Sequence, residues 1–143
     1  MSSAVDVAAR ALARRDRSET DVRRILARKG VSDVEAEEAL ERLRGLGALD
    51  DARFAAGRAT GLAERGYGDA GIAARLARDG VEREHVDAAI GALAPERDRA
   101  AALVARRGVT LRTARWLAGR GFSSDSIESG VPGIADTRAS ELG

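Results

Sequence analysis

The sequence offers few residues that could do chemistry. It has one histidine, His85, and no cysteine, so it lacks both a Cys–His nucleophile pair and a thiolate metal site. The carboxylates Asp50 and Asp51 are adjacent, but they stand where a helix is expected to begin, and short acceptors there cap free backbone N–H groups. We therefore expect helix capping rather than metal binding from this pair. We expect no catalytic residue, no metal and no cofactor, and no ligand or base role for His85.

Arginine is the more informative residue type. Residues 1–30 carry eight Arg or Lys against four Asp or Glu, and residues 95–122 carry seven against two, although the whole chain has a net charge of only +1. Two basic blocks that flank a near-neutral centre suit an anionic partner, while solvated helix faces are the alternative interpretation. The candidate partner-binding residues are Arg14, Arg15, Arg17, Arg23, Arg24, Arg28, Arg58, Tyr67, Arg106, Arg107, Arg112, Arg115 and Arg120.

An internal repeat indicates which elements carry these residues. The first part of the chain matches the second at an offset of 50 residues, and the second matches a third at an offset of 41. Fixed spacing of apolar and glycine positions is typical of repeated helical units. Matching positions are Leu12 with Leu62, Gly30 with Gly80, Leu62 with Leu103, and Gly80 with Gly121.

Apolar periodicity, capping residues and glycines predict three helices in each unit and no strand. The expected helices span 5–14, 18–28 and 33–46, then 51–65, 69–78 and 83–93, with the last three beginning at 95, 110 and 123. The predicted fold is all-α, with tandem three-helix units in an elongated, curved array. The predicted divisions are 1–48, 49–94, a curtailed third unit at 95–131, and a flexible tail at 132–143.

Several side chains have specific expected roles within these units. Ser18 with Asp21 resembles a capping box, and Asp69 is expected to cap the helix that follows Gly66-Tyr67-Gly68. A buried core is expected in the second unit. Its members are Phe54, Leu62, Ile72 and Leu76. Trp116 suits either a core position or an anchor for a partner, because the residue type at the equivalent position differs between the units.

Composition excludes other classes of protein. The sequence has no run of about 18 apolar residues and no signal-peptide pattern, so we expect a soluble cytoplasmic protein. Asparagine and glutamine, the usual readers of adenine, are absent from the chain. Sequence-specific DNA binding is therefore not expected, while non-sequence-specific nucleic-acid binding remains the alternative function.

Three groups of motifs resemble the RecX family of regulatory proteins. The first unit carries Arg15-Asp16-Arg17-Ser18-Glu19 and Leu26. The second carries Leu49-Asp50-Asp51-Ala52-Arg53-Phe54-Ala55, Arg65-Gly66-Tyr67-Gly68, Ile72, Leu76 and Gly80-Val81. The third carries Leu117, Arg120-Gly121-Phe122 and Ile127, so the resemblance covers roughly residues 5–130.

This resemblance implies a function as well as a fold. It implies a curved molecule of tandem three-helix repeats that docks along the groove of a filament of the RecA recombinase on single-stranded DNA. Inhibition of the recombinase, ATPase and SOS co-protease activities would follow, from a monomer without enzymatic activity. The sequence departs from the family pattern in its third unit, which ends at Ser129-Gly130-Val131-Pro132 without a long basic last helix.

Overall fold

A computed structural model describes residues 3–133 of the chain, so most of the predicted tail lies outside the described residues. The described part contains helices and connecting segments but no strand, which confirms the predicted fold class. The helices are α1 (Ala4–Arg14), α2 (Glu19–Arg28), α3 (Asp33–Gly45), α4 (Asp51–Glu64), α5 (Asp69–Arg78), α6 (Arg83–Gly91), α7 (Glu96–Arg107), α8 (Leu111–Gly119) and α9 (Ser124–Gly130).

Short polar side chains set the starts of most helices. The side chains of Ser18, Ser32, Asp50, Thr110 and Ser123 each accept a hydrogen bond from the backbone N–H three residues on. These bonds satisfy donors that have no partner within the helix, which is why the starts were predictable to within one or two residues.

Two of the predicted caps are wrong in detail. Gly68, not Asp69, is the N-cap of α5, and this cap forms no side-chain hydrogen bond. A Cβ at position 68 would lie 2.5 Å from the backbone nitrogen of Phe122, so this position has no room for a capping side chain. The capping box at Ser18 is only half formed: Ser18 accepts from the Asp21 N–H, while the short Asp21 side chain lies 3.6 Å from Arg24. The end of α4 is as expected, since Gly66 has a φ of +86°.

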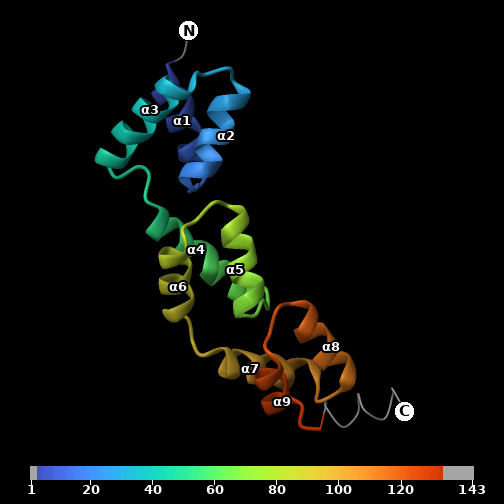
Figure 1. Ribbon diagram of the computed structural model, residues 1–143. Coiled ribbons are helices and arrows are strands. Elements are labelled where there is room, and N and C mark those ends of the chain that lie inside the picture. The colour runs from blue at the N-terminus through green and yellow to red at the C-terminus, as the bar shows by residue number, and fades with distance from the viewer. Residues whose placement is uncertain (1–2, 134–143) are drawn as a thin grey trace.

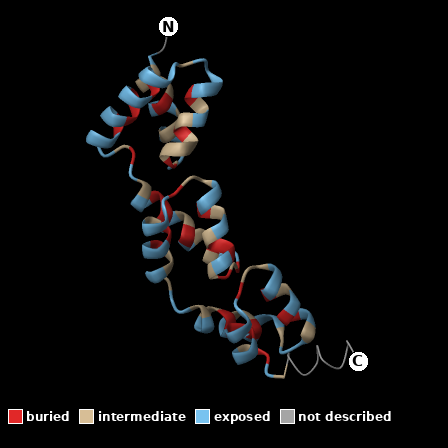
Figure 2. Ribbon diagram, viewed as in Figure 1, coloured by how far each residue is buried: buried red, intermediate tan, exposed pale blue. Residues whose placement is uncertain are grey.

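The helices form three units, α1–α3, α4–α6 and α7–α9, and each unit buries its own apolar core (Figure 2). In the second unit Phe54, Leu62, Ile72 and Leu76 are all buried, as predicted. The three units follow one another along a gently bent rod, with the amino terminus at one end (Figure 1). Within residues 3–133 each core cluster draws its members from one unit, so the units do not share an apolar core.

Candidate functional site

The contact between the first and second units is made by the start of α2. The backbone N–H of Glu19 donates to Oδ1 of Asp51 (2.9 Å), and the Ser18 hydroxyl donates to the carbonyl of Asp79 (2.5 Å). Asp51 therefore caps a helix in the preceding unit, while its neighbour Asp50 caps α4 itself. The two adjacent carboxylates serve two different helices.

The contact between the second and third units has the same construction. The Asp69 N–H donates to Oε2 of Glu96 (2.8 Å), and the Gly68 N–H donates to the carbonyl of Arg120 (2.8 Å). Asp51 and Glu96 each occupy the first position of the first helix in their units. At both junctions the start of a second helix thus meets the carboxylate at the first position of the next unit's first helix.

The second junction adds direct contact between backbones. The Ala70 N–H donates to the carbonyl of Gly121 (3.2 Å). A Cβ at Gly71 would fall on the carbonyl oxygen of Arg120, and a Cβ at Gly121 would fall on the backbone of Gly71. Both glycines are required by this close approach, and Gly121 also has a φ of +87°.

The two junction carboxylates have opposite pKa shifts. Burial tends to raise the pKa of Glu96, but the hydrogen bonds from the Ser126 and Ser123 hydroxyls and from the Ser123 and Asp69 N–H groups outweigh it and hold that pKa below its ordinary value. Burial raises the pKa of Asp51. The same structural role is thus filled at one junction by a carboxylate whose ionised form is stabilised and at the other by a carboxylate whose ionised form is disfavoured.

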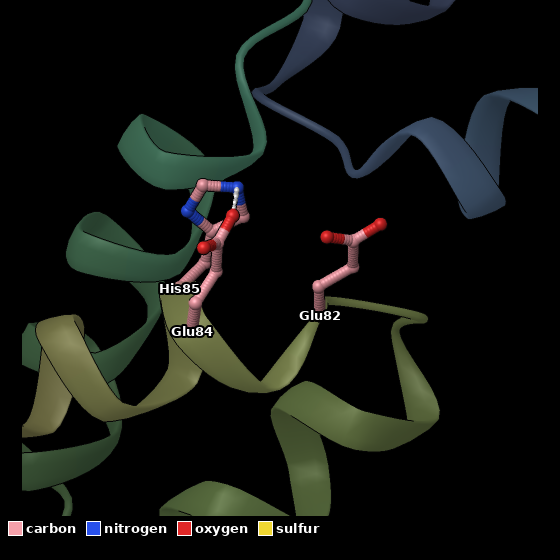
Figure 3. A group of neighbouring side chains, drawn as sticks. All are labelled: Glu82, Glu84 and His85. Atoms are coloured by element: carbon pink, nitrogen blue, oxygen red, sulfur yellow. Dashed lines mark ion pairs between the residues drawn. The ribbon is translucent and has the colours of Figure 1, made fainter.

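His85 lies beside the first junction, at the start of α6. Glu82, Glu84 and His85 have potential ligand atoms within 4.8 Å of one another, and Nε2 of His85 lies 3.7 Å from Oε1 of Glu84 (Figure 3). Glu82 and Glu84 are exposed. Glu82 and His85 also line a cleft of about 370 Å³ between the units, together with Glu19 and Asp51.

The arginines of the first basic block are partly neutralised by the chain itself. Arg14, Arg15 and Arg28 are exposed. Three of the candidate arginines have partners: Arg17 donates to the carbonyl of Ala11 (3.1 Å), Arg23 pairs with Glu37 (2.8 Å), and Arg24 lies near Asp21 and donates to the carbonyl of Arg78 (3.3 Å). In the second unit Arg58 pairs with Asp79 (2.8 Å).

The second basic block, residues 95–122, is organised around aromatic rings instead. The guanidinium carbon of Arg107 lies 3.7 Å from the ring centroid of Trp116, and that of Arg120 lies 4.9 Å from Trp116 and 4.4 Å from Tyr67. Arg75 lies 3.9 Å from the Tyr67 centroid. These five side chains, here called the arginine–aromatic row, cross the junction of the second and third units. Arg106, Arg112 and Arg115 are exposed nearby in the sequence.

Comparison with known proteins fits this architecture. The model of the first three-helix domain of RecX matches residues 4–43, and that of the second matches residues 50–90. Regulatory protein RecX of Xanthomonas oryzae pv. oryzae (strain MAFF 311018) is 35% identical over 128 residues, which cover 82% of this chain and 80% of that protein. The chain belongs to the RecX family.

Further RecX proteins extend the match. Regulatory protein RecX of Stenotrophomonas maltophilia (strain R551-3) is 35% identical over 126 residues, covering 81% of this chain and 77% of that protein. RecX from Lactobacillus salivarius shares the fold with a TM-score of 0.78 at 16% identity, over 92% of this chain and 94% of that structure. A second RecX crystal structure has a TM-score of 0.68 at 24% identity, over 93% of this chain and 73% of that one. Both relatives identified by sequence thus carry the name regulatory protein RecX.

The residues that carry the RecX resemblance are mainly structural. Arg53 donates to the carbonyls of Gly47 and Ala48 and pairs with Asp16 across the first junction, and Phe54 lies in the core. The others support helix ends, junctions or cores, and they are Asp50, Asp51, Gly66, Tyr67, Gly68, Gly121 and Phe122. The RecX motifs of this chain therefore support helix ends and cores as well as the junctions between units.

Sequence reasoning missed three residues that the junctions use. Glu96 directly follows the N-cap Pro95, just as Asp51 directly follows the N-cap Asp50. A comparison of the helix starts of the two units would therefore have indicated that Glu96 and Asp51 are equivalent. Arg99 donates to Oδ1 of Asp69 (2.8 Å), and Arg75 ends the arginine–aromatic row.

No helix in residues 3–133 is both long and apolar enough to cross a bilayer.

Proposed function

We propose that this RecX-family chain binds the filament of the RecA recombinase on single-stranded DNA and inhibits its recombinase, ATPase and SOS co-protease activities. The chain acts as a cytoplasmic monomer and has no catalytic activity or cofactor of its own. The observation that carries this proposal is the rod of three units, joined twice by the same junction, in a chain whose relatives are regulatory proteins (Figure 1).

A rod of this kind suits a repetitive partner. Several weak contacts distributed over three units act as linked sites, so the affinity of the whole exceeds that of any unit by a factor on the order of 10²–10⁴. Exposed arginines at both ends supply contacts for an anionic filament.

The test is inhibition of RecA-driven ATP hydrolysis on single-stranded DNA. A first-block variant reverses Arg14, Arg15 and Arg28 to Glu, and a second-block variant reverses Arg106 and Arg112 to Glu. All five residues are exposed. Each variant should inhibit at least about tenfold more weakly than the intact chain, because loss of one end removes the linked gain. Circular dichroism checks that each variant keeps its helices.

One result would contradict the proposal, and another would contradict its assignment of the contacts to the basic blocks. If the intact chain leaves ATP hydrolysis unchanged, RecA is not the target. If both variants inhibit as strongly as the intact chain, the basic blocks are solvated faces and the contacts lie elsewhere on the rod.

Non-sequence-specific nucleic-acid binding is the second candidate function. The exposure of Arg106 and Arg112 in a block with a net charge of +5 supports it. Such binding would weaken steeply as salt rises, since it depends on counterion release. A mobility-shift assay with naked single-stranded DNA at two salt concentrations distinguishes it, because the RecA proposal requires inhibition at concentrations that leave naked DNA unbound.

A further inference from the structure

The arginine–aromatic row gathers three arginines around two aromatic rings. Within residues 3–133, none of the ion pairs closer than 4.0 Å includes Arg75, Arg107 or Arg120. Seven other arginines of the same region do have carboxylate partners. They are Arg23, Arg24, Arg44, Arg53, Arg58, Arg83 and Arg99. The row thus concentrates three positive charges that no carboxylate of residues 3–133 pairs with inside 4.0 Å.

The geometry of the row limits what it can bind. Each of the two rings, Tyr67 and Trp116, already has two guanidinium groups within 5 Å of its centroid. Proteins that bind single-stranded nucleic acid stack bases on such rings. Rings occupied by the chain's own arginines have little face left for a base. The stacked guanidiniums keep their N–H edges for a planar acceptor such as a carboxylate.

The composition of the surrounding surface favours a protein partner. Arg, Trp and Tyr are the residue types that dominate binding energy at protein interfaces. Val109, at the corner between α7 and α8, adds an apolar side chain that is 67% exposed. Arg107, at the outer end of the row, is exposed, whereas the two rings and the other two arginines are half-buried. A partly desolvated arginine set beside apolar surface is typical of an interface centre.

We propose that the arginine–aromatic row is a docking surface for a carboxylate-bearing segment of a partner protein. Arg107 receives a carboxylate through its N–H edge, and Arg120 and Tyr67 hold the row in place across the junction. This inference deepens the proposed function, on which it rests for the identity of the partner as the protein component of the filament.

The single tryptophan of the chain, Trp116, reports on the row directly. Its emission is followed while the full chain is titrated with poly-L-glutamate or with a 30-residue single-stranded oligo-dT, at matched concentrations of anionic groups. Poly-L-glutamate should change the emission saturably and bind more tightly than oligo-dT. Arg107→Glu should weaken the binding of poly-L-glutamate by about tenfold or more, and the milder Arg107→Gln by less.

A matched control is Arg83→Glu, which makes the same charge change at a side chain that is 93% exposed in the second unit. It should alter the affinity for poly-L-glutamate by less than about twofold. The proposal is overturned if oligo-dT binds more tightly, if Arg83→Glu weakens binding as much as Arg107→Glu, or if neither probe changes the emission.

RecA-driven ATP hydrolysis separates this proposal from the proposed function. If the intact chain inhibits RecA and Arg107→Glu inhibits equally well, the docking surface is wrong and the proposed function stands. If the intact chain does not inhibit RecA but still binds poly-L-glutamate through Arg107, the proposed function is wrong and the surface serves another acidic protein.

Discussion

Glu96 shows how much one side chain contributes at a junction. Its carboxylate accepts hydrogen bonds from the Asp69 N–H of the second unit and from Ser123 and Ser126 at the start of α9. A negative charge at the starts of two helices also interacts favourably with their dipoles. The carboxylate therefore positions α5, α7 and α9 relative to one another.

Glu96→Gln should lower the free energy of unfolding by about 1–2 kcal/mol at pH 7, because an amide offers one uncharged acceptor in place of two charged ones. The pKa of Glu96 lies below its unfolded value of about 4.3, so its stabilisation is complete above that pH and is lost as the pH falls toward the folded pKa. The variant and the intact chain should converge in urea unfolding curves measured between pH 5 and pH 3. An offset that is the same at every pH would contradict this assignment.

Asp51→Asn should have the opposite effect. The raised pKa of Asp51 means that its ionised form is disfavoured in the folded state, chiefly by burial. Asparagine keeps an oxygen for the Glu19 N–H and carries no charge, so we expect no loss of stability at pH 7 and a gain of less than about 1 kcal/mol.

The pH dependence of Asp51→Asn follows from the same shift. Asp51 in the folded chain takes up its proton above the unfolded pKa of about 3.9, so the advantage of the variant should shrink as the pH falls toward 4. Thermal unfolding at pH 7, 5 and 4 measures this. A lower melting temperature at pH 7 than that of the intact chain would show that the charge is needed at the first junction.

At the scale of elements, the second junction depends on the absence of side chains. Gly71 lies within α5, where alanine would ordinarily favour the helix by about 1 kcal/mol. The added methyl group would collide with the carbonyl oxygen of Arg120, which also accepts the Gly68 N–H. Helix propensity and packing between units therefore oppose each other at this position.

Gly71→Ala should accordingly lower the free energy of unfolding by about 1–3 kcal/mol, because the clash outweighs the gain in propensity. Gly57→Ala is the matched control, since Gly57 lies within α4 and a Cβ there meets nothing within 4 Å. The control should gain about 0.5–1 kcal/mol. Chemical denaturation of both variants measures the two effects. Equal stabilisation by both substitutions would show that the units are not in contact at Gly71.

The helices were predictable because their signals are local, whereas the junctions were not. A cap such as Ser32 and the amide that it serves are three residues apart, so short windows of sequence contain both partners. Asp51 and Glu19 are 32 residues apart, and nothing in either segment indicates that the capped helix belongs to another unit. Gly68 was misjudged for the same reason, because the backbone that excludes a side chain comes from position 122.

The basic residues show a similar limit in the candidate site. The two basic blocks have similar net charges in the sequence. They differ in the structure, because the Arg23–Glu37 ion pair and the contact of Arg107 with the Trp116 ring form only when the helices pack together. Tyr67 and Arg120 were predicted to bind a partner. The structure places both within the second junction, where they contact each other. Their partner-binding role remains a prediction, now combined with a structural one.

At the scale of the molecule, the arrangement of units determines the overall dimensions. A compact globule of this length would have a radius of gyration of about 14 Å. The three units instead lie in a row, so small-angle X-ray scattering should give a clearly larger radius and an elongated distance distribution (Figure 1). A value near 14 Å would mean that the rod folds back on itself in solution.

The repeated junction also gives the rod a direction. At both junctions within residues 3–133, the start of a unit's second helix contacts the following unit. The first unit has no equivalent of Asp51, since α1 begins with Ala4 and Asp6 completes its own capping box with Ser3. The two ends of the rod are therefore structurally different. On a filament that itself has polarity, the two possible orientations of the bound rod are not equivalent, so bound molecules would all point in the same direction.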